Sequence, residues 1–515
     1  MFLAVLGFGA SAQGLSSLLN LCPAGGRVSM EMDCVMDLTV VSDCGSDNMA
    51  SAVNVTAGRL DDRWNSRTVY VQTADGSMGA KLVFVHPGEN FLRFGDAISL
   101  SLDKCVISRD AGNGALEISG VRASNVRSVS HNQAVPPKIR EISALTDADI
   151  YTYVEIQGLD IVFPDGSYSN IQESWASKMD GYLTLLRDDS GNGINMIVNA
   201  ACRFRRTGKS LPSRVNLRGV HVGEKMRRYG NDIGRYSIRP IDENGIVPLR
   251  QKAAWKTLAG WVKPEGSSQS LEFEINGIVG GLFNKGVKND RIYNDAGNVP
   301  ALLWTDSDSE VRVYSGYNGV SAENDGFVGN GALMFITPTV SWYEWDGKGC
   351  VTGSKAFYIQ LSTSKYKSGL LQLALEWSAG TQDGNKSCWF PVDWKAEYSL
   401  DGINWTLLEE IAIHKPFISL HSVPWGDCVI KHSGHDFKLQ AGFDTAPGPQ
   451  QHSFSIPSEA MGQKELLLRI SPASRSVAKP RVSVSDSYRD LYVEQVPAEC
   501  QSWIRIEAVK IDYRQ

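Results

Sequence analysis

The stretch Thr68-Val-Tyr-Val-Gln-Thr-Ala-Asp-Gly-Ser-Met-Gly-Ala-Lys-Leu-Val-Phe84 decides the fold, because a second version of it occurs later in the chain. The second version reads Tyr182-Leu-Thr-Leu-Leu-Arg-Asp-Asp-Ser-Gly-Asn-Gly-Ile-Asn-Met-Ile-Val198. Each copy has the composition of a strand, a turn rich in Asp, Gly and Ser, and another strand. A further strand-like segment follows each hairpin after a similar gap, at 96–102 and 213–219. The repeat spans about residues 36–135 and 153–250, and a five-stranded unit of roughly 100 residues fits an OB-like barrel.

The first copy also carries a resemblance to a known family. Residues 68–79 resemble the "strand, Tyr-Ile-Gln-Asp, Gly-rich turn" signature of tandem OB-like modules in secreted and surface proteins of Bacteroidetes, a family of uncharacterised function. Where that family has Asp after Gln, this chain has Thr73, and the acidic residue comes two positions later. The resemblance covers about residues 30–250. It implies an exported bacterial protein, often with an appended β-sandwich, and no catalytic residues.

The repeat pattern is lost from Trp255 onward, where irregular strands alternate with long loops. Residues 392–407 resemble the "Tyr-Ser-x-Asp-Gly-x-x-Trp" hairpin of galactose-binding-like, discoidin-type sandwiches. In this hairpin Asp401-Gly402 supplies a turn with positive φ, and Trp405 returns to pack on the sheet. Residues 503–513 alternate cleanly and predict a closing strand.

Together these patterns predict an all-β chain with no helix longer than about two turns. Proline-containing segments at 133–137 and 246–251 mark the expected boundaries, since proline interrupts strand pairing. We expect a signal peptide at 1–12, OB-like barrels at 28–135 and 138–250, and a jelly-roll or galactose-binding-like sandwich at 251–515.

The chain has 515 residues and a net charge of −6, which argues against wholesale binding of polyanions. Residues 2–12 have the apolar core of a secretory signal, and Ala10-Ser-Ala12 suits cleavage before Gln13. A buried N-terminal strand and lipid attachment at Cys22 are the alternatives. No later stretch has the ~18 apolar residues of a membrane span. We therefore expect export to the cell surface, the periplasm or the medium.

The nine cysteines are scattered singly, which is sparse for a disulfide scaffold. Cys350 and Cys388 are the candidates for a disulfide, and buried free thiols are the favoured alternative.

Positive charge is concentrated between residues 203 and 239, where eleven basic residues stand against Glu224 and Asp232. In an OB-like barrel such a stretch, interleaved with aromatic residues, can follow a nucleic acid or an acidic glycan. The alternative is a solvated surface or one that faces an acidic neighbour. The predicted ligand-binding residues here are Arg203, Arg205, Arg206, Arg227, Arg228 and Tyr229.

Tryptophans of the C-terminal part form a second group of candidates. Trp345, Trp389 and Trp425 lie in loop-like sequence, where an exposed indole can stack on a flat sugar face. Trp377, Trp394 and Trp405 lie within strand patterns and are expected in the core.

Metal chemistry has weaker signals. His432, His435 and Asp436 have the donor types of a transition-metal site, but solvated loop histidines are the ordinary alternative, so we predict no metal. No cofactor is expected beyond a possible structural Ca²⁺ held by acidic loops, although the twelve-residue calcium loop is absent from the sequence.

Catalytic motifs are absent from the sequence: it has no Gly-x-Ser-x-Gly, no phosphate-binding loop and no His-Glu-x-x-His. The sequence thus predicts an exported, non-enzymatic binding or adhesion protein for an extracellular polymer, foremost a carbohydrate. One alternative is an extracellular nucleic-acid-binding accessory module that uses the basic stretch of the second barrel. The other is a glycan hydrolase in the C-terminal domain, because glycosidase carboxylates have no fixed spacing.

Overall fold

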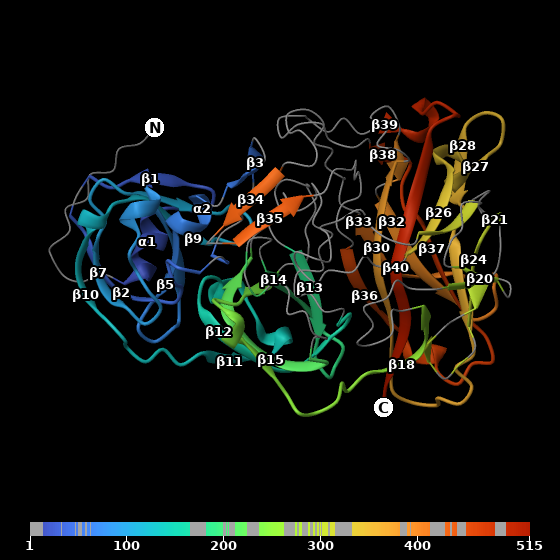
Figure 1. Cartoon of the computed structure of the whole chain (residues 1–515), viewed down its shortest axis with the longest axis horizontal. Coiled ribbons are helices and arrows are strands. Elements are labelled where there is room, and N and C mark those ends of the chain that lie inside the picture. The colour runs from blue at the N-terminus through green and yellow to red at the C-terminus, as the bar shows by residue number, and fades with distance from the viewer. Residues whose placement is uncertain are drawn as a thin grey trace.

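The computed structural model is nearly all β-structure, with two barrels and a sandwich in a row (Figure 1). The described residues are 14–515 except 32, 47, 50–53, 57–58, 62, 165–181, 199–201, 203, 205–211, 224–235, 262–272, 276–277, 281–286, 289–291, 294–295, 298, 300, 307–309, 315–331, 382–388, 392, 413–427, 433–434, 440–449 and 479–490. Among these, the α-helices are α1 (Leu15–Leu21) and α2 (Arg63–Arg67), both within the two turns expected.

The first barrel is built from the first copy of the repeat. Its strands are β1 (Arg27–Ser29), β2 (Val35–Val40), β5 (Thr68–Gln72), β6 (Gly79–Phe84), β7 (Ala97–Ser101), β8 (Val106–Arg109), β9 (Leu116–Val121) and β10 (Val126–Ser130), with the small hairpin β3 (Asn54–Thr56) and β4 (Arg59–Asp61) beside them. β2 pairs with β5 and β7, β5 with β6, β6 with β9 in parallel, and β9 with β8. β7 and β8 follow one another in the chain with residues 102–105 between them, and β7 pairs with β2 whereas β8 pairs with β9.

The second barrel repeats this order with an unbroken fourth strand. Its strands are β11 (Lys138–Arg140), β12 (Tyr153–Ile161), β13 (Tyr182–Arg187), β14 (Gly193–Val198), β15 (Arg214–Val222), β16 (Ser237–Arg239) and β17 (Ile246–Pro248). The ring closes as β12-β13-β14-β16-β15-β12, and β14 and β16 are parallel, as β6 and β9 are. The prediction of two OB-like barrels is confirmed.

The C-terminal part forms two packed antiparallel sheets. The barrel-side sheet contains β18 (Lys256–Trp261), β21 (Val287–Lys288), β23 (Ala296–Gly297), β25 (Glu310–Tyr314), β26 (Ala332–Pro338), β30 (Leu370–Thr381), β36 (Gln450–Ile456) and β40 (Gln501–Arg514). The distal sheet contains β19 (Phe273–Ile275), β20 (Ile278–Gly280), β22 (Ile292–Tyr293), β24 (Ala301–Thr305), β29 (Phe357–Leu361), β32 (Asp393–Ser399), β33 (Thr406–Ala412) and β37 (Leu466–Pro472). The predicted closing strand is β40, which lies centrally and pairs with β30 on one side and with β26 and β18 on the other.

Smaller elements surround the sandwich. They are the hairpin of β27 (Tyr343–Trp345) and β28 (Cys350–Ser354), the sheet of β31 (Phe390–Pro391), β38 (Ser476–Ala478) and β39 (Leu491–Tyr492), the hairpin of β34 (Cys428–His432) and β35 (His435–Leu439), and the 3₁₀ turns η8 (Thr339–Trp342) and η11 (Val493–Gln495). The β34–β35 hairpin contacts β4 of the first barrel (Figure 1).

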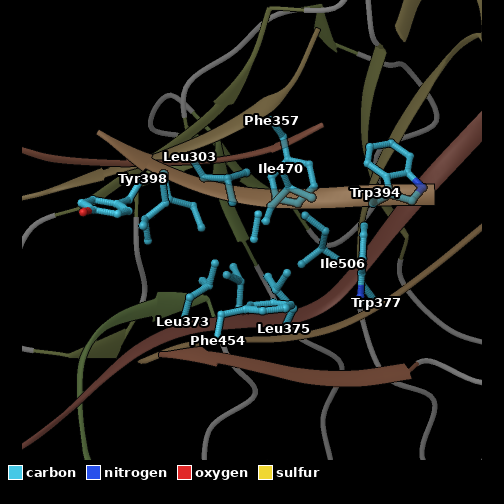
Figure 2. Close-up of a cluster of buried hydrophobic side chains, with 14 of the residues drawn as sticks. Leu303, Phe357, Leu373, Leu375, Trp377, Trp394, Tyr398, Phe454, Ile470 and Ile506 are labelled. Carbon is cyan, nitrogen blue, oxygen red and sulfur yellow. The ribbon is translucent and has the colours of Figure 1, made fainter. Parts of the chain in front are cut away.

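The sandwich core lies between the two sheets. Figure 2 shows Leu303, Phe357 and Trp394 from the distal sheet facing Leu373 and Trp377 from the barrel-side sheet. Trp377 and Trp394 are fully buried, as predicted, and meet edge to face with ring centroids 5.6 Å apart. Each fully buried large apolar side chain contributes about 1.5–3 kcal/mol. The sandwich thus has a large core of its own, and the predicted all-β fold class is confirmed.

The second barrel is joined tightly to the barrel-side sheet. Val162, Phe163 and Leu185 of the barrel pack on Ala374 and Ala508 of the sheet.

A buried ion pair crosses the same junction. Arg187 of β13 binds Asp512 of β40, and the two side chains are 2% and 1% exposed. The Arg187 guanidinium also lies 4.5 Å from the centroid of the Trp255 ring.

The division of the chain into domains at the expected residue boundaries stays a prediction.

The two barrels share a second junction. Asn48 donates hydrogen bonds to the carbonyls of Ile197 (2.8 Å) and Pro240 (2.9 Å), and Tyr70 stacks on Tyr151. His221 is fully buried there and meets the ring of Tyr236 edge to face.

The N-terminal region contributes to the first barrel. The expected signal peptide lies outside the described residues. Leu15 and Leu18 of α1 are buried in the barrel core, and so is Cys22 at the end of the helix. Lipid attachment at Cys22 would remove α1 from this core, so the structure argues against it.

Two further sequence predictions concern thiols and membrane spans. The cysteines whose side chains are described, Cys350 among them, form no disulfide, and Cys388 lies outside the described part. Within the part of the chain that the structure describes, no helix has the length and apolarity needed to cross a bilayer.

Candidate functional site

The outward side of the distal sheet carries the most distinctive set of side chains. Strand alternation places Phe357, Ile359 and Leu361 of β29 in the core, so Tyr358 and Gln360 point outward. β37 alternates in the same way and presents Arg469 outward between the core residues Leu468 and Ile470. The positions that face away from the core are therefore aromatic and charged rather than uniformly polar.

Strand register brings these side chains into one line. Trp304 of β24 pairs with Tyr358, Tyr358 pairs with Arg469, Arg469 with Glu397 of β32, and Glu397 with Leu407 of β33. Directly paired residues lie on the same face of a sheet. The row thus crosses five strands. We call this row, together with Trp405 above it, the distal face.

The aromatic rings of the distal face contact one another. Trp304 and Tyr358 stack with centroids 5.3 Å apart, and Tyr358 lies 5.9 Å from Trp405. The Tyr358 hydroxyl donates a hydrogen bond of 2.8 Å to Asp306. Burial, with the nearby Asp306 carboxylate, raises the pKa of Tyr358, so the phenol stays protonated at physiological pH.

Trp405 is positioned by the turn that precedes it. The Asp401 carboxylate accepts hydrogen bonds from the backbone N–H groups of Ile403 (2.8 Å) and Asn404 (2.7 Å), and Gly402 has φ of +74°. These N–H groups, with that of Asn404 foremost, lower the pKa of Asp401. The predicted positive-φ turn is confirmed, and it fixes the side of the sheet on which Trp405 lies.

The charged pair of the row, Glu397 and Arg469, has further partners on the same face. Glu397 accepts from Arg469 Nε at 2.6 Å and from Lys395 Nζ at 3.2 Å, and the Arg469 guanidinium lies 4.1 Å from the centroid of the Trp405 ring. Burial alone would raise the pKa of Glu397, but Arg469 and Lys395 outweigh it and hold the pKa below its usual value. The distal face therefore combines aromatic rings with an ionised hydrogen-bonding pair, which suits a ligand with apolar faces and hydroxyl groups.

Two of the three predicted tryptophan platforms are each hydrogen-bonded to η8, at the end of the sandwich. The Trp345 indole N–H donates to the Val340 carbonyl at 2.8 Å, and the Thr339 hydroxyl donates to the Trp389 carbonyl. Trp345 is 42% exposed, whereas Trp389 is partly buried and packs against the core. Trp425 lies outside the described residues.

Other residues, which the sequence analysis did not predict as binding residues, lie at the same end of the sandwich. Tyr492 is 58% exposed, and η11, which follows it directly, contacts η8. Arg475 lies 5.4 Å from the centroid of the Tyr492 ring and pairs with Glu494 at 2.6 Å. We call Trp345, Trp389, Arg475, Tyr492 and Glu494 the η8 end.

The predicted basic site of the second barrel lies mostly outside the described residues. That holds for Arg203, Arg205, Arg206, Arg227, Arg228 and Tyr229. The described members of the basic stretch have structural partners: Arg214 binds Asp160 (2.6 Å) and Asp189 (2.8 Å), and Arg218 binds Glu155. Arg239 is fully buried at the junction of the barrels.

The weak metal candidates occupy a hairpin. His432 and His435 are register partners at the turn of β34 and β35, followed by Asp436; their side chains lie outside the described part. Among the side chains that are described, no cluster of three or more His, Cys, Asp or Glu could hold a metal ion.

Sequence reasoning missed the distal face. It placed Trp405 in the core, but Trp405 is half-buried on the opposite side of the sheet. The signal available was the alternation in Phe357-Tyr-Ile-Gln-Leu361 and Leu466-Leu-Leu-Arg-Ile470, in which the outward positions include Tyr and Arg.

Comparisons with known proteins give little guidance. No family model and no curated protein matches the chain. Among solved structures, the K1 cleaved adhesin domain of Lys-gingipain from Porphyromonas gingivalis W83 is 13% identical and covers 41% of this chain and 89% of its own, with a TM-score of 0.20.

Two carbohydrate-binding modules match similarly. TmCBM27, described for specific mannan recognition, is 11% identical, covering 40% of this chain and 89% of its own at a TM-score of 0.16. CBM32-3 from a family 31 glycoside hydrolase of Clostridium perfringens is 13% identical, covering 40% and 88% at a TM-score of 0.15. Such scores do not establish a common function, which must be argued from the residues of this chain.

Proposed function

We propose that this chain is a non-enzymatic carbohydrate-binding protein and that the distal face is its binding surface. The observation that carries the proposal is the row in which Trp304, Tyr358, Arg469 and Glu397 share one sheet face, with Trp405 above it. A sugar ring presents apolar C–H groups on its faces and hydroxyl groups at its edge. It therefore requires both aromatic rings and fixed hydrogen-bonding groups.

The wider role belongs to the same proposal. As the resemblance implies, the protein would be exported and act at the cell surface, in the periplasm or in the medium, as a binding or adhesion module for an extracellular polymer. The η8 end, with Trp345 and Tyr492 exposed, supports a second contact surface that includes Trp389. Trp425, which lies outside the described residues, stays a predicted sugar platform. We also propose the division into domains at 28–135, 138–250 and 251–515.

Nucleic-acid binding has less support. Arg214 and Arg218 of the basic stretch are bound to carboxylates, and charge engaged in this way contributes little to neutralising phosphates. The residues that would carry the nucleic-acid alternative lie outside the described part of the chain.

The test is retention of the full chain on a panel of immobilised polysaccharides and single-stranded DNA, at low and high salt. We expect retention on at least one polysaccharide and little change with salt, because stacking is not electrostatic. Trp405→Ala should reduce that affinity at least tenfold, since it removes the ring that covers Arg469.

Phe91→Ala is the matched control, because Phe91 is a 43% exposed aromatic residue of the first barrel. It should bind like the unaltered chain. Retention on DNA alone, or equal binding by Trp405→Ala and the unaltered chain, would contradict the proposal.

A further inference from the structure

The shape of the distal face indicates an extended ligand. Its row crosses five strands, and neighbouring strands lie about 4.8 Å apart, so the row is roughly 19 Å long. One end of the row is Leu407, which is 51% exposed, and the adjacent turn residue Ile403 is still more exposed. A single sugar would cover a fraction of this length, whereas several sugar units in line would cover it all.

The charges on this face disfavour an acidic ligand. Among the side chains that the structure describes on this face, four outward carboxylates, those of Asp306, Glu397, Glu410 and Glu465, stand against two bases, Lys395 and Arg469. Both bases contact Glu397, and Lys395 also has Glu410 as its register partner, so each base lies beside a carboxylate. An anionic polymer on this surface would meet net repulsion.

The carboxylates of this face also have hydrogen-bonding or register partners within the protein, which disfavours binding of a cationic ligand. Asp306 accepts hydrogen bonds from the Tyr358 hydroxyl (2.8 Å) and the Ala356 N–H (2.7 Å), and Glu465 accepts from Gln360. Glu410 faces Lys395 across the strand pair. Neutral hydroxyl groups, which both donate and accept, fit such a set of paired groups.

We infer that the distal face binds an uncharged polysaccharide along an internal stretch of several sugar units, laid across the strands, and that it rejects acidic polysaccharides. This inference rests on the proposed function, and it concerns a surface other than the basic stretch of the second barrel, for which an acidic glycan is expected. Arg469 donates from Nε to Glu397, and its guanidinium lies 4.1 Å from the centroid of the Trp405 ring.

The experiment compares each polysaccharide with its own charged derivative. Uncharged polymers such as hydroxyethyl cellulose, galactomannan and dextran are assayed by affinity electrophoresis with the full chain, and the polymer that binds best is then carboxymethylated to rising degrees. We expect affinity to fall at least tenfold on carboxymethylation at low salt and to recover in part at high salt. Oligosaccharides of the same polymer should bind more tightly as they lengthen until the row is covered.

A charge-reversal variant tests whether the charge of the face, rather than its shape, excludes the carboxymethylated polymer. Glu410→Lys should restore binding of the carboxymethylated polymer, while Glu499→Lys, at an exposed residue outside the row, should not. Equal or tighter binding of the charged derivative, abolished by Trp405→Ala, would overturn the inference and leave the proposed function standing. Binding of no polymer in either form would overturn both.

Discussion

His221 is fully buried, and its imidazole is neutral at physiological pH. Burial lowers its pKa to about 4 from 6.5, although the Asp149 carbonyl and the carboxylates of Asp149 and Asp147 favour the charged ring. Because the imidazole is neutral in the folded protein, its contribution to stability is present above pH 6.5. It is lost as pH falls from 6.5 towards 4.

The expected loss is about 3 kcal/mol at the acid end of this range. His221→Phe keeps a ring beside Tyr236 and removes the titration. Urea unfolding at pH 7 and pH 4.5 should show a smaller difference for the variant than for the unaltered chain. Equal pH dependence in the two proteins would contradict the assignment.

For single residues, the sequence predicts well whether a tryptophan is buried, but it predicts poorly on which side of the sheet the tryptophan lies. Trp377 and Trp394 were expected in the core and are there. Trp405 has similar neighbours in sequence, but it follows the Asp401-Gly402 turn, and the geometry of that turn decides which side of the sheet it reaches. Composition around a tryptophan does not contain this information.

Between elements, the pairing of β32 with β37 depends in part on a partly buried ion pair. The side chains of Glu397 and Arg469 are 8% and 23% exposed. Arg469→Met should destabilise the chain by about 2 kcal/mol, because Glu397 would keep its burial and lose its closer partner. The double variant Arg469→Met, Glu397→Gln should be more stable than Arg469→Met alone. Additive losses in thermal unfolding would show that the two side chains act independently.

The repeat reveals the strands of both barrels because alternation and turn residues are local signals. It does not reveal that the fourth strand of the first barrel is split into β7 and β8. The break coincides with Lys104, whose φ is +61°, a conformation that lysine rarely adopts. Alternation could have indicated which residues point outward, but not that they form one row, because register between strands far apart in sequence brings Trp304, Arg469 and Glu397 together.

For the whole molecule, the junction of the second barrel with the sandwich is the contact that local sequence patterns do not predict. Arg187 and Asp512 are 325 residues apart in the chain, so no local pattern predicts their contact. Burial alone would raise the pKa of Asp512, but Lys510 and Arg187 hold it below its usual value. Asp512 also accepts a hydrogen bond of 2.8 Å from Thr257.

Asp512→Asn should therefore cost 3–5 kcal/mol, roughly the cost of leaving one charge of a buried pair without its partner. Thr257→Val, which removes only the neutral hydrogen bond, should cost about 1 kcal/mol. Chemical unfolding followed by tryptophan fluorescence measures both. A loss for Asp512→Asn no larger than that for Thr257→Val would mean that the ion pair does not hold the junction.

The central position of β40 has a consequence for biosynthesis. Residues 501–514 leave the ribosome after every other described strand, yet β18, β26 and β30 all need them as a neighbour. The strands of the two barrels all precede the sandwich in the chain. The barrel-side sheet, in contrast, lacks its central strand until β40 has been synthesised. In that interval the face of the sheet that is later buried in the core stays exposed.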